Sequence, residues 1–290
     1  MNRRLFVPVL ICGWVTAQTP PLPLPNHPIG RCVRVLGVTA PEDARTAGFE
    51  YVELALQDLL PLPDAEFARI VERIHKLGLP AISGYGFMPA DVMIVGPSVD
   101  WAKVDEALRQ GIGRAKQLGL SMVVYGNLLN RARRAPEGFS IAEARKQLQE
   151  FGKRAAREGK KNGLTVLFEP MPPASTNTIN TVAEGLALVE AVNDPHFQLL
   201  IDFGYVTQSK EDLKILHRAA KHIRQVEIQN PNGRVYPKAA EEADYASFFR
   251  ALKQGGYRGG FSIHGAPTDF FVDAPRAIAM LRGVAGPALR

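Results

Sequence analysis

Cysteine and long hydrophobic runs are both scarce in this sequence. Its 290 residues include two cysteines, Cys12 and Cys32. The apolar stretch from Leu5 to Trp14 is too short to span a bilayer as a helix. Removal of that stretch would leave Cys32 alone and would exclude an intrachain disulfide, which a domain of this size does not need. We interpret Cys32 as a small hydrophobic residue of the core.

The N-terminus has the composition of an export signal. Asn2-Arg3-Arg4 is a basic start, and Val15-Thr16-Ala17 supplies small residues after the apolar stretch. We therefore expect residues 1–17 to be a signal peptide, and the mature chain to be exported to the periplasm or secreted, without membrane association. A buried N-terminal strand is the alternative. Loss of both arginines lowers the formal net charge from +6 to +4, which does not imply nucleic-acid binding.

The remaining sequence alternates between strand-like and helix-like segments. Residues 18–30 form a proline-rich lead-in, and residues 31–290 form the domain. Glycines such as Gly78 and Gly163, placed just before strands, are typical of helix C-caps. Eight such units predict an α/β fold, a single-domain (β/α)8 TIM barrel. An open doubly wound sheet is disfavoured, because no glycine-rich phosphate-binding turn follows the first strand. The expected strands are Cys32–Gly37, Tyr51–Leu56, Ala81–Ser83, Met122–Tyr125, Thr165–Glu169, Gln198–Asp202, Arg224–Ile228 and Gly260–His264. The expected helices are Pro41–Ala47, Asp64–Leu77, Val99–Leu118, Ile141–Asn162, Val182–Val192, Glu211–Lys221, Tyr245–Gln254 and Pro275–Val284.

Acidic or imidazole side chains stand at the ends of the last four expected strands. They are Glu169, Asp202, Glu227 and His264. In such barrels chemistry gathers where the C-terminal ends of the strands meet, so these side chains should converge. Like charges at close range need a cation between them. We therefore predict that all four bind one divalent metal ion, with Mn preferred and Mg, Co or Zn as alternatives. Structural ion pairs at a metal-free site are the competing interpretation.

Motifs along nearly the whole mature chain resemble a known family. Tyr85-Gly86-Phe87-Met88-Pro89, Ala132–Phe139, Glu169-Pro170-Met171 and Thr176–Val182 are similar to loops of the xylose-isomerase-like TIM-barrel sugar (phosphate) isomerases and epimerases, close to the ketose 3-epimerases. The resemblance implies a small-molecule carbohydrate substrate and often a homo-oligomer. It also implies a metal ion that polarises the substrate while acid/base groups pass a proton through an ene-diolate.

The departures from the family pattern concern the site itself. The resemblance implies Glu, Asp, His and Glu on strands five to eight, whereas this chain has Glu227 and His264 at the last two positions. Both replacements are metal-competent, whereas drift would bring arbitrary residues. We expect Glu169, His264 and Glu227 to be catalytic, with His264 able to accept a proton near pH 7. Three residues beyond Asp202, where the resemblance implies a substrate-binding histidine, this chain has Tyr205. In the loop after the fifth strand, Pro172-Pro173 replaces the Asn-Arg pair that the resemblance implies.

Four further residues are candidates for substrate binding. Glu53 matches a polar position of the family, with an ion pair to Arg34 as the alternative. Arg133 and Tyr205 occupy positions that resemble substrate-binding ones. Arg234 follows the seventh strand, where its planar fork could clamp substrate or anchor its own loop.

Three other functions compete with a metal-dependent isomerase or epimerase. A keto-sugar lyase, hydratase or deglycosylating enzyme would use the same metal and base but expel a leaving group. A non-catalytic carbohydrate-binding barrel would bind saccharide without metal. A DNA-repair nuclease of this fold would draw several histidines to the strand ends, where this chain has His264 alone, and the sequence has no strong basic stripe.

Overall fold

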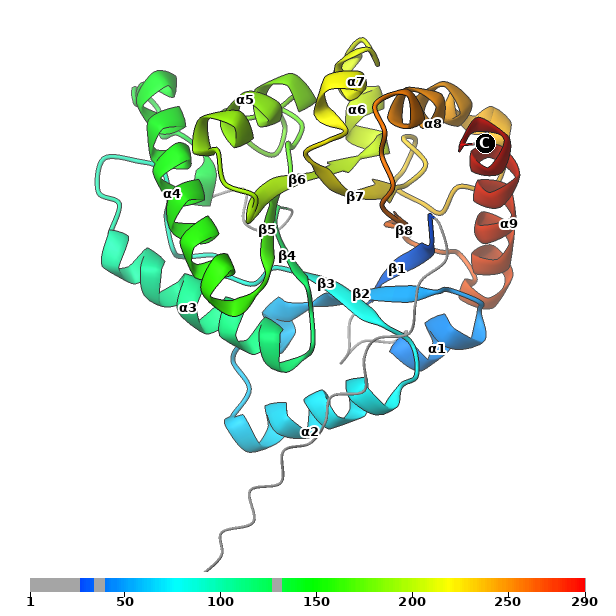
Figure 1. Cartoon of the computed structure of the whole chain (residues 1–290), viewed down its shortest axis with the longest axis horizontal. Helices are drawn as coiled ribbons and strands as arrows, with labels where there is room; N and C mark the ends of the chain where they lie inside the picture. Colours follow the sequence, from blue (N-terminus) through cyan, green and yellow to red (C-terminus); the bar gives the residue numbers. More distant parts are fainter. Residues whose placement is uncertain (1–26, 34–39, 127–131, 290) are drawn as a thin grey trace, which may run out of the picture.

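The computed structural model describes residues 27–33, 40–126 and 132–289. Eight parallel strands close into a barrel in sequential order, from β1 to β8 and back to β1, and helices surround it (Figure 1). The prediction of a (β/α)8 barrel is therefore confirmed. The strands are β1 Ile29–Val33, β2 Tyr51–Ala55, β3 Ala81–Tyr85, β4 Met122–Tyr125, β5 Thr165–Phe168, β6 Phe197–Asp202, β7 Ile223–Ile228 and β8 Phe261–Ile263.

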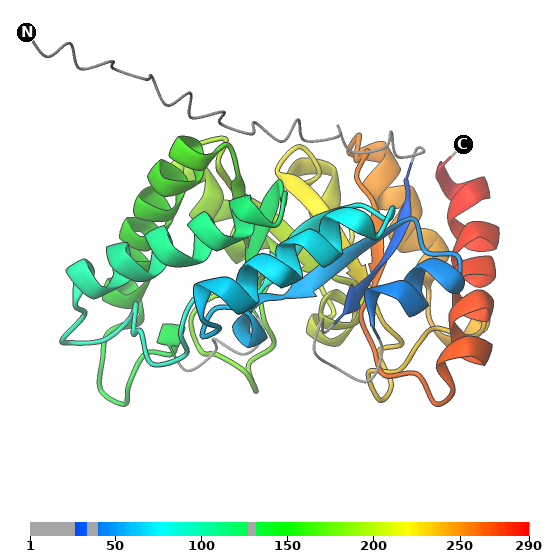
Figure 2. The same ribbon diagram turned by 90° about the horizontal axis from the view of Figure 1, so that it is seen from below.

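The helices occupy the connections between strands. They are α1 Pro41–Thr46, α2 Asp64–Lys76, α3 Trp101–Gln117, α4 Ile141–Asn162, α5 Val182–Val192, α6 Phe203–Ser209, α7 Ile215–Ala219, α8 Tyr245–Gln254 and α9 Phe270–Leu289, with the 3-10 helices η1 Leu56–Asp58 and η3 Ala240–Glu242. Figure 2 shows α9 standing along the outside of the barrel. The predicted helix C-caps at Gly78 and Gly163 have φ of 65° and 73°. Among the described residues, no helix combines the length and the apolar character that a membrane span requires.

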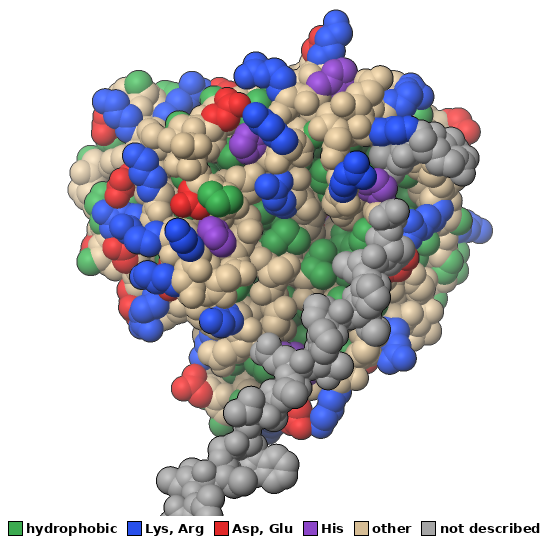
Figure 3. Space-filling model, viewed as in Figure 1, with side chains coloured by type: hydrophobic (Ala, Val, Ile, Leu, Met, Phe, Trp, Pro, Cys, Tyr) green, Lys and Arg blue, Asp and Glu red, His purple; other side chains and the backbone are tan. Residues whose placement is uncertain are grey.

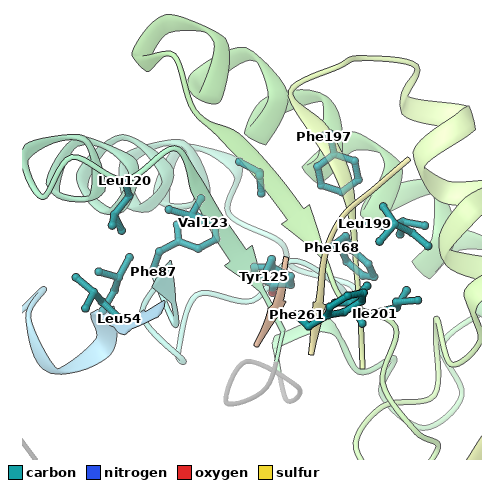
Figure 4. Packing of buried hydrophobic residues seen from close by; sticks show 14 of the residues in the cluster. Leu54, Phe87, Leu120, Val123, Tyr125, Phe168, Phe197, Leu199, Ile201 and Phe261 are labelled. Carbon is teal, nitrogen blue, oxygen red and sulfur yellow. The ribbon is translucent and has the colours of Figure 1, made fainter. Parts of the chain in front are cut away.

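The alternation of side chains along the strands divides the core into two parts. Val123, Phe168 and Leu199 belong to the main core, where they pack with other buried side chains of the strands such as Tyr125 and Phe261 (Figure 4). Their neighbours along the strands, Val124, Leu167 and Leu200, form a separate small cluster. Because successive side chains of a strand point to opposite faces, this second set lies inside the barrel.

The barrel interior next to β2, β3, β7 and β8 is polar. The Tyr51 hydroxyl and the Ser262 hydroxyl are hydrogen-bonded at 2.6 Å, and Gln225 Nε2 donates to Ser262 Oγ at 3.1 Å. Ser83 Oγ donates to Glu53 Oε2 at 2.9 Å. The interior therefore supplies a buried hydrogen-bonded layer on this half of the barrel.

The structure corrects the start of the first strand. β1 begins at Ile29 rather than Cys32, so Ile29 and Gly30 belong to the barrel and not to the lead-in. Gly30 pairs with Tyr51, and a Cβ at this position would lie 2.1 Å from the Tyr51 ring. In a sequence glycine usually indicates a loop, whereas here Gly30 leaves room for a side chain of the neighbouring strand. The predicted end of the strand, residues 34–37, lies outside the described residues.

One helix, α6, was not predicted, and two helix predictions were wrong in extent. The segment after β6 forms α6, because the Asp202 side chain accepts a hydrogen bond from the Tyr205 amide and begins a helix there. The helix expected over Glu211–Lys221 is limited to α7. α9 begins five residues before Pro275, where Asp269 Oδ1 accepts hydrogen bonds from the amides of Phe271 and Val272.

Candidate metal and sugar site

The four predicted ligands stand at the C-terminal ends of four consecutive strands. Asp202 is the last residue of β6, and Glu227 is the last but one of β7. Glu169 and His264 directly follow β5 and β8. Asp202 and Glu227 are partners in the β6–β7 register. Parallel strands that end at one edge thus bring these side chains to one end of the barrel.

Cys32 joins Glu227 and His264 in a cluster of ligand-type atoms. His264 Nδ1 is hydrogen-bonded to Glu227 Oε2, and the Cys32 thiol donates to Glu227 Oε1 at 3.7 Å. The ligand atoms of the three residues all lie within 4.8 Å of one another. The interpretation of Cys32 as a residue of the apolar core is therefore wrong. Its side chain is half-buried and faces the candidate site.

Glu169 and Asp202 lie outside this three-residue cluster but share its electrostatic field. Each is 2% exposed, and Glu169 Oε1 and Asp202 Oδ2 have no hydrogen-bond partner among the described residues. The other Asp202 oxygen accepts from Gln229 Nε2 at 2.7 Å and from the Tyr205 amide at 3.0 Å. Glu53 is fully buried and its Oε1 is likewise unpartnered. Buried carboxylate oxygens without donors are costly, and a divalent cation fits them.

The protonation equilibria of the metal-free site reflect burial and mutual repulsion. Burial and the charge of Glu227 raise the pKa of Glu53 to about 7 and that of Asp202 to about 6. Burial, Glu227 and Asp202 also raise the pKa of Glu169. Burial alone would lower the pKa of His264, but the charges of Glu227, Asp202 and Glu169 raise it to about 10. Without a metal ion, these neighbouring charges favour the imidazolium form of His264 over the neutral imidazole.

Arg133 fixes the backbone next to Glu169. Its guanidinium is fully buried, donates from Nη1 to the Glu169 carbonyl oxygen at 2.7 Å, and lies over the Phe168 ring. Gly126 leaves room for the Glu169 side chain, since a Cβ there would lie 2.0 Å from Glu169 Oε2. Together these two residues determine where the Glu169 carboxylate can lie.

Arg234 reaches Asp202 through a residue that the sequence analysis missed. Arg234 Nε donates to Gln229 Oε1 at 3.1 Å, and Gln229 Nε2 donates to Asp202. The guanidinium also lies over the Tyr205 ring, 5.6 Å from its centroid. Gln229 stands two residues beyond Glu227, directly after β7; continued alternation past the strand end is the signal that could have revealed it.

Two alternatives raised by the sequence can be compared with the structure. Arg34, the alternative partner of Glu53, lies outside the described residues; among those described, Ser83 donates to Glu53. On the face presented in Figure 3, Lys and Arg side chains are dispersed, with Asp and Glu side chains between them. Among the described residues, that face has no continuous basic stripe of the kind that binds a phosphate backbone.

Comparison with known proteins identifies the family. A model of the xylose isomerase-like TIM barrel matches residues 41–279. The chain belongs to this family. L-ribulose 3-epimerase of Methylomonas sp. (strain DH-1) is 29% identical over 224 residues, which cover 74% of this chain and 73% of that protein. Ketose 3-epimerase of Arthrobacter globiformis is 27% identical over 220 residues, 75% of this chain and 73% of that protein.

A solved structure agrees with this assignment. D-Allulose 3-epimerase from Methylomonas sp., in complex with D-allulose, superposes with a TM-score of 0.72 at 24% identity, over 89% of this chain and 97% of that one. This likeness supports the family's barrel. The curated relatives are sugar epimerases, and the prediction of a sugar isomerase or epimerase is confirmed at that level.

Proposed function

We propose that this enzyme is a divalent-metal-dependent epimerase or isomerase of a free or modified, non-phosphorylated keto sugar. The observation that carries the proposal is a set of buried carboxylates on the barrel strands and at their ends. Three of them, Glu53 within β2, Glu169 after β5 and Asp202 at the end of β6, each keep an oxygen without a donor among the described residues. The names of the curated relatives support the reaction class. The expected export favours a non-phosphorylated substrate, because sugar phosphates are chiefly cytoplasmic metabolites.

Glu169, Asp202, Glu227 and His264 would hold the metal ion. Judged by its three carboxylate ligands, the site favours a hard or borderline ion, of which Mn²⁺ is the preferred one. When bound, it supplies a Lewis acid that polarises the substrate carbonyl and its neighbouring hydroxyl. The positive charge also relieves the mutual repulsion that raises the pKa of Glu169 and Asp202.

The side chains of the site then carry out the proton transfer. The Glu169 carboxylate takes the proton from the carbon next to the carbonyl, which leaves an ene-diolate. Glu227 or His264 returns a proton to the same carbon from the opposite face, which inverts that centre. The hydrogen bond from Arg133 to the Glu169 carbonyl keeps the first carboxylate in place. Arg234 donates to Gln229, and Gln229 donates to Asp202, so these hydrogen bonds position the Asp202 carboxylate.

The reaction is tested by hydrogen exchange with solvent. The purified chain, loaded in turn with Mn²⁺, Mg²⁺, Co²⁺ and Zn²⁺, is incubated in D₂O with ketoses, 3-keto glycosides and the corresponding sugar phosphates. NMR should show deuterium at the epimerised carbon for a non-phosphorylated sugar. The exchange should be lost in Glu169→Gln and kept in Glu241→Gln, which changes an exposed carboxylate.

The products separate the competing functions. An unsaturated or deglycosylated product would indicate the lyase reaction in place of epimerisation. Saccharide binding without exchange under any metal would contradict the proposal and indicate a binding barrel.

We also propose that the chain is exported and that the enzyme acts outside the cytoplasm. The support is the N-terminal composition, since residues 1–26 lie outside the described residues. N-terminal sequencing of the protein recovered from fractionated cells should show a mature chain that begins at Gln18. A cytoplasmic protein that keeps Arg3 and Arg4 would contradict this. The homo-oligomer that the resemblance implies stays a prediction, and light scattering of the purified protein would measure the oligomeric state.

A further inference from the structure

Cys32 stands in an environment that an inert core thiol would not occupy. It is half-buried near the end of β1, where it is the register partner of Glu53 and donates to Glu227. Its neighbours are therefore two carboxylates and, through Glu227, the His264 imidazole. Burial and both carboxylates hold the pKa of the free thiol well above its usual range. The same neighbours favour a bound cation.

The cluster comes from strands that meet only when the barrel closes. Cys32 lies on β1, Glu227 on β7 and His264 just after β8, and β1 pairs with β8 to complete the barrel. Sulfur, carboxylate oxygen and imidazole nitrogen lie within 4.8 Å of one another. A second observation points to a ligand at this place: Glu53, fully buried beside Cys32, keeps an Oε1 without a partner among the described residues.

We propose that Cys32 is a metal ligand, and that its thiolate joins Glu227 and His264 on the ion. The inference rests on the proposed metal site and makes it more specific. On binding, the thiol proton leaves to solvent and a sulfur–metal bond forms in its place. A sulfur ligand beside an imidazole selects Zn²⁺ or Co²⁺ over Mg²⁺ and Mn²⁺, because soft donors favour these ions. The resemblance implies Glu at position 264, and the histidine that stands there gives this donor set its nitrogen.

Cobalt titration tests the sulfur ligand directly, since a cobalt–thiolate bond gives a charge-transfer band in the near ultraviolet. The full-length chain is titrated with Co²⁺ alone, beside Cys12→Ser and Cys32→Ser. Cys12 lies outside the described residues and serves as the matched cysteine control. We expect the band in the wild type and in Cys12→Ser, and its absence from Cys32→Ser. The chain has two cysteines, so a thiolate band in Cys12→Ser can come only from Cys32. The test therefore holds even if Cys32→Ser does not fold.

Zinc and manganese affinities, measured by isothermal titration calorimetry, give the second readout. Cys32→Ser should weaken Zn²⁺ binding by about 10-fold or more and change Mn²⁺ binding by less than about 3-fold, with an unchanged circular dichroism spectrum. Cobalt bound without the charge-transfer band in the wild type would overturn the role of Cys32 while leaving the metal site itself standing. No cobalt bound by any of the three chains would overturn both proposals.

Discussion

Glu227 Oε2 and His264 Nδ1 are hydrogen-bonded to each other at the ends of the adjacent strands β7 and β8. These are two of the positions at which the chain departs from the pattern that the resemblance implies, and each carries the residue type expected at the other. Because the two side chains touch, the exchange keeps one carboxylate and one imidazole in the same small volume. Cys32 on β1 lies in the same cluster, with its sulfur within 4.8 Å of the ligand atoms of Glu227 and His264.

The first prediction concerns Glu227, which accepts hydrogen bonds from Cys32 and His264. Glu227→Gln keeps the shape but removes the charge between them, so divalent metal affinity should fall by about 100-fold or more, beyond the effect of an outer-shell change. Isothermal titration of the metal-free protein measures this. Glu241→Gln, on the surface, should bind as the wild type does. Equal affinity in both variants would remove Glu227 from the ligand set.

The second prediction compares two neighbouring arginines. Arg133 is buried and donates to the Glu169 carbonyl, whereas Arg134 is exposed. Arg133→Lys removes the planar fork and leaves that carbonyl without its donor, so the free energy of unfolding should fall by about 1–3 kcal/mol and kcat by about 10-fold or more. Arg134→Lys should change neither. Urea denaturation and initial-rate kinetics give the two readouts, and similar behaviour of both variants would contradict the positioning role.

The third prediction is a pH dependence of the metal-free protein. Its source is Glu53, whose pKa in the folded chain is raised from 4.5 to about 7, chiefly by burial. Below pH 4.5 the carboxyl is protonated in both states and has no effect. As the pH rises from 4.5 to 7, the unfolded chain ionises first, so stability falls; above 7 the loss is complete.

The variant Glu53→Gln removes that loss. In EDTA, its advantage in unfolding free energy over the wild type should grow between pH 4.5 and pH 8 by roughly 3 kcal/mol at most. Chemical denaturation at several pH values measures it. The exposed Glu241→Gln should show no such growth, and a pH-independent difference for Glu53→Gln would show that Glu53 is ionised in the folded state.

The fourth prediction concerns the space beside Glu169. A Cβ at Gly126 would lie 2.0 Å from Glu169 Oε2, so Gly126→Ala should displace the carboxylate and abolish the solvent exchange described above. Gly113→Ala is the control, because a Cβ in that part of α3 would meet nothing within 4 Å. It should keep the exchange and stabilise the protein by about 0.5–1 kcal/mol. Exchange at the wild-type rate in Gly126→Ala would contradict the crowding argument.

The local sequence pattern was sufficient to predict the limits of several helices and strands. The limits of β4, α4, α5 and α8 agree with those expected from apolar periodicity and helix ends. The start of β1 and the helix α6 were not predictable in this way. Gly30 is a strand residue because the Tyr51 ring occupies the space that a side chain would fill. α6 begins because the Asp202 side chain caps it, a role that the sequence did not indicate, since a carboxylate at a strand end suggested only a metal ligand.

The eight units, and the polar residues that end the last four strands, were predictable from the sequence because side-chain alternation and helix periodicity are local properties. Tertiary structure alone decided that Cys32 contacts Glu227, 195 residues away, and that Gln229 joins Arg234 to Asp202. The physical reason is closure: the β1–β8 pairing sets the register of the whole barrel. Only that register places the thiol of the first strand among the donors of the last two.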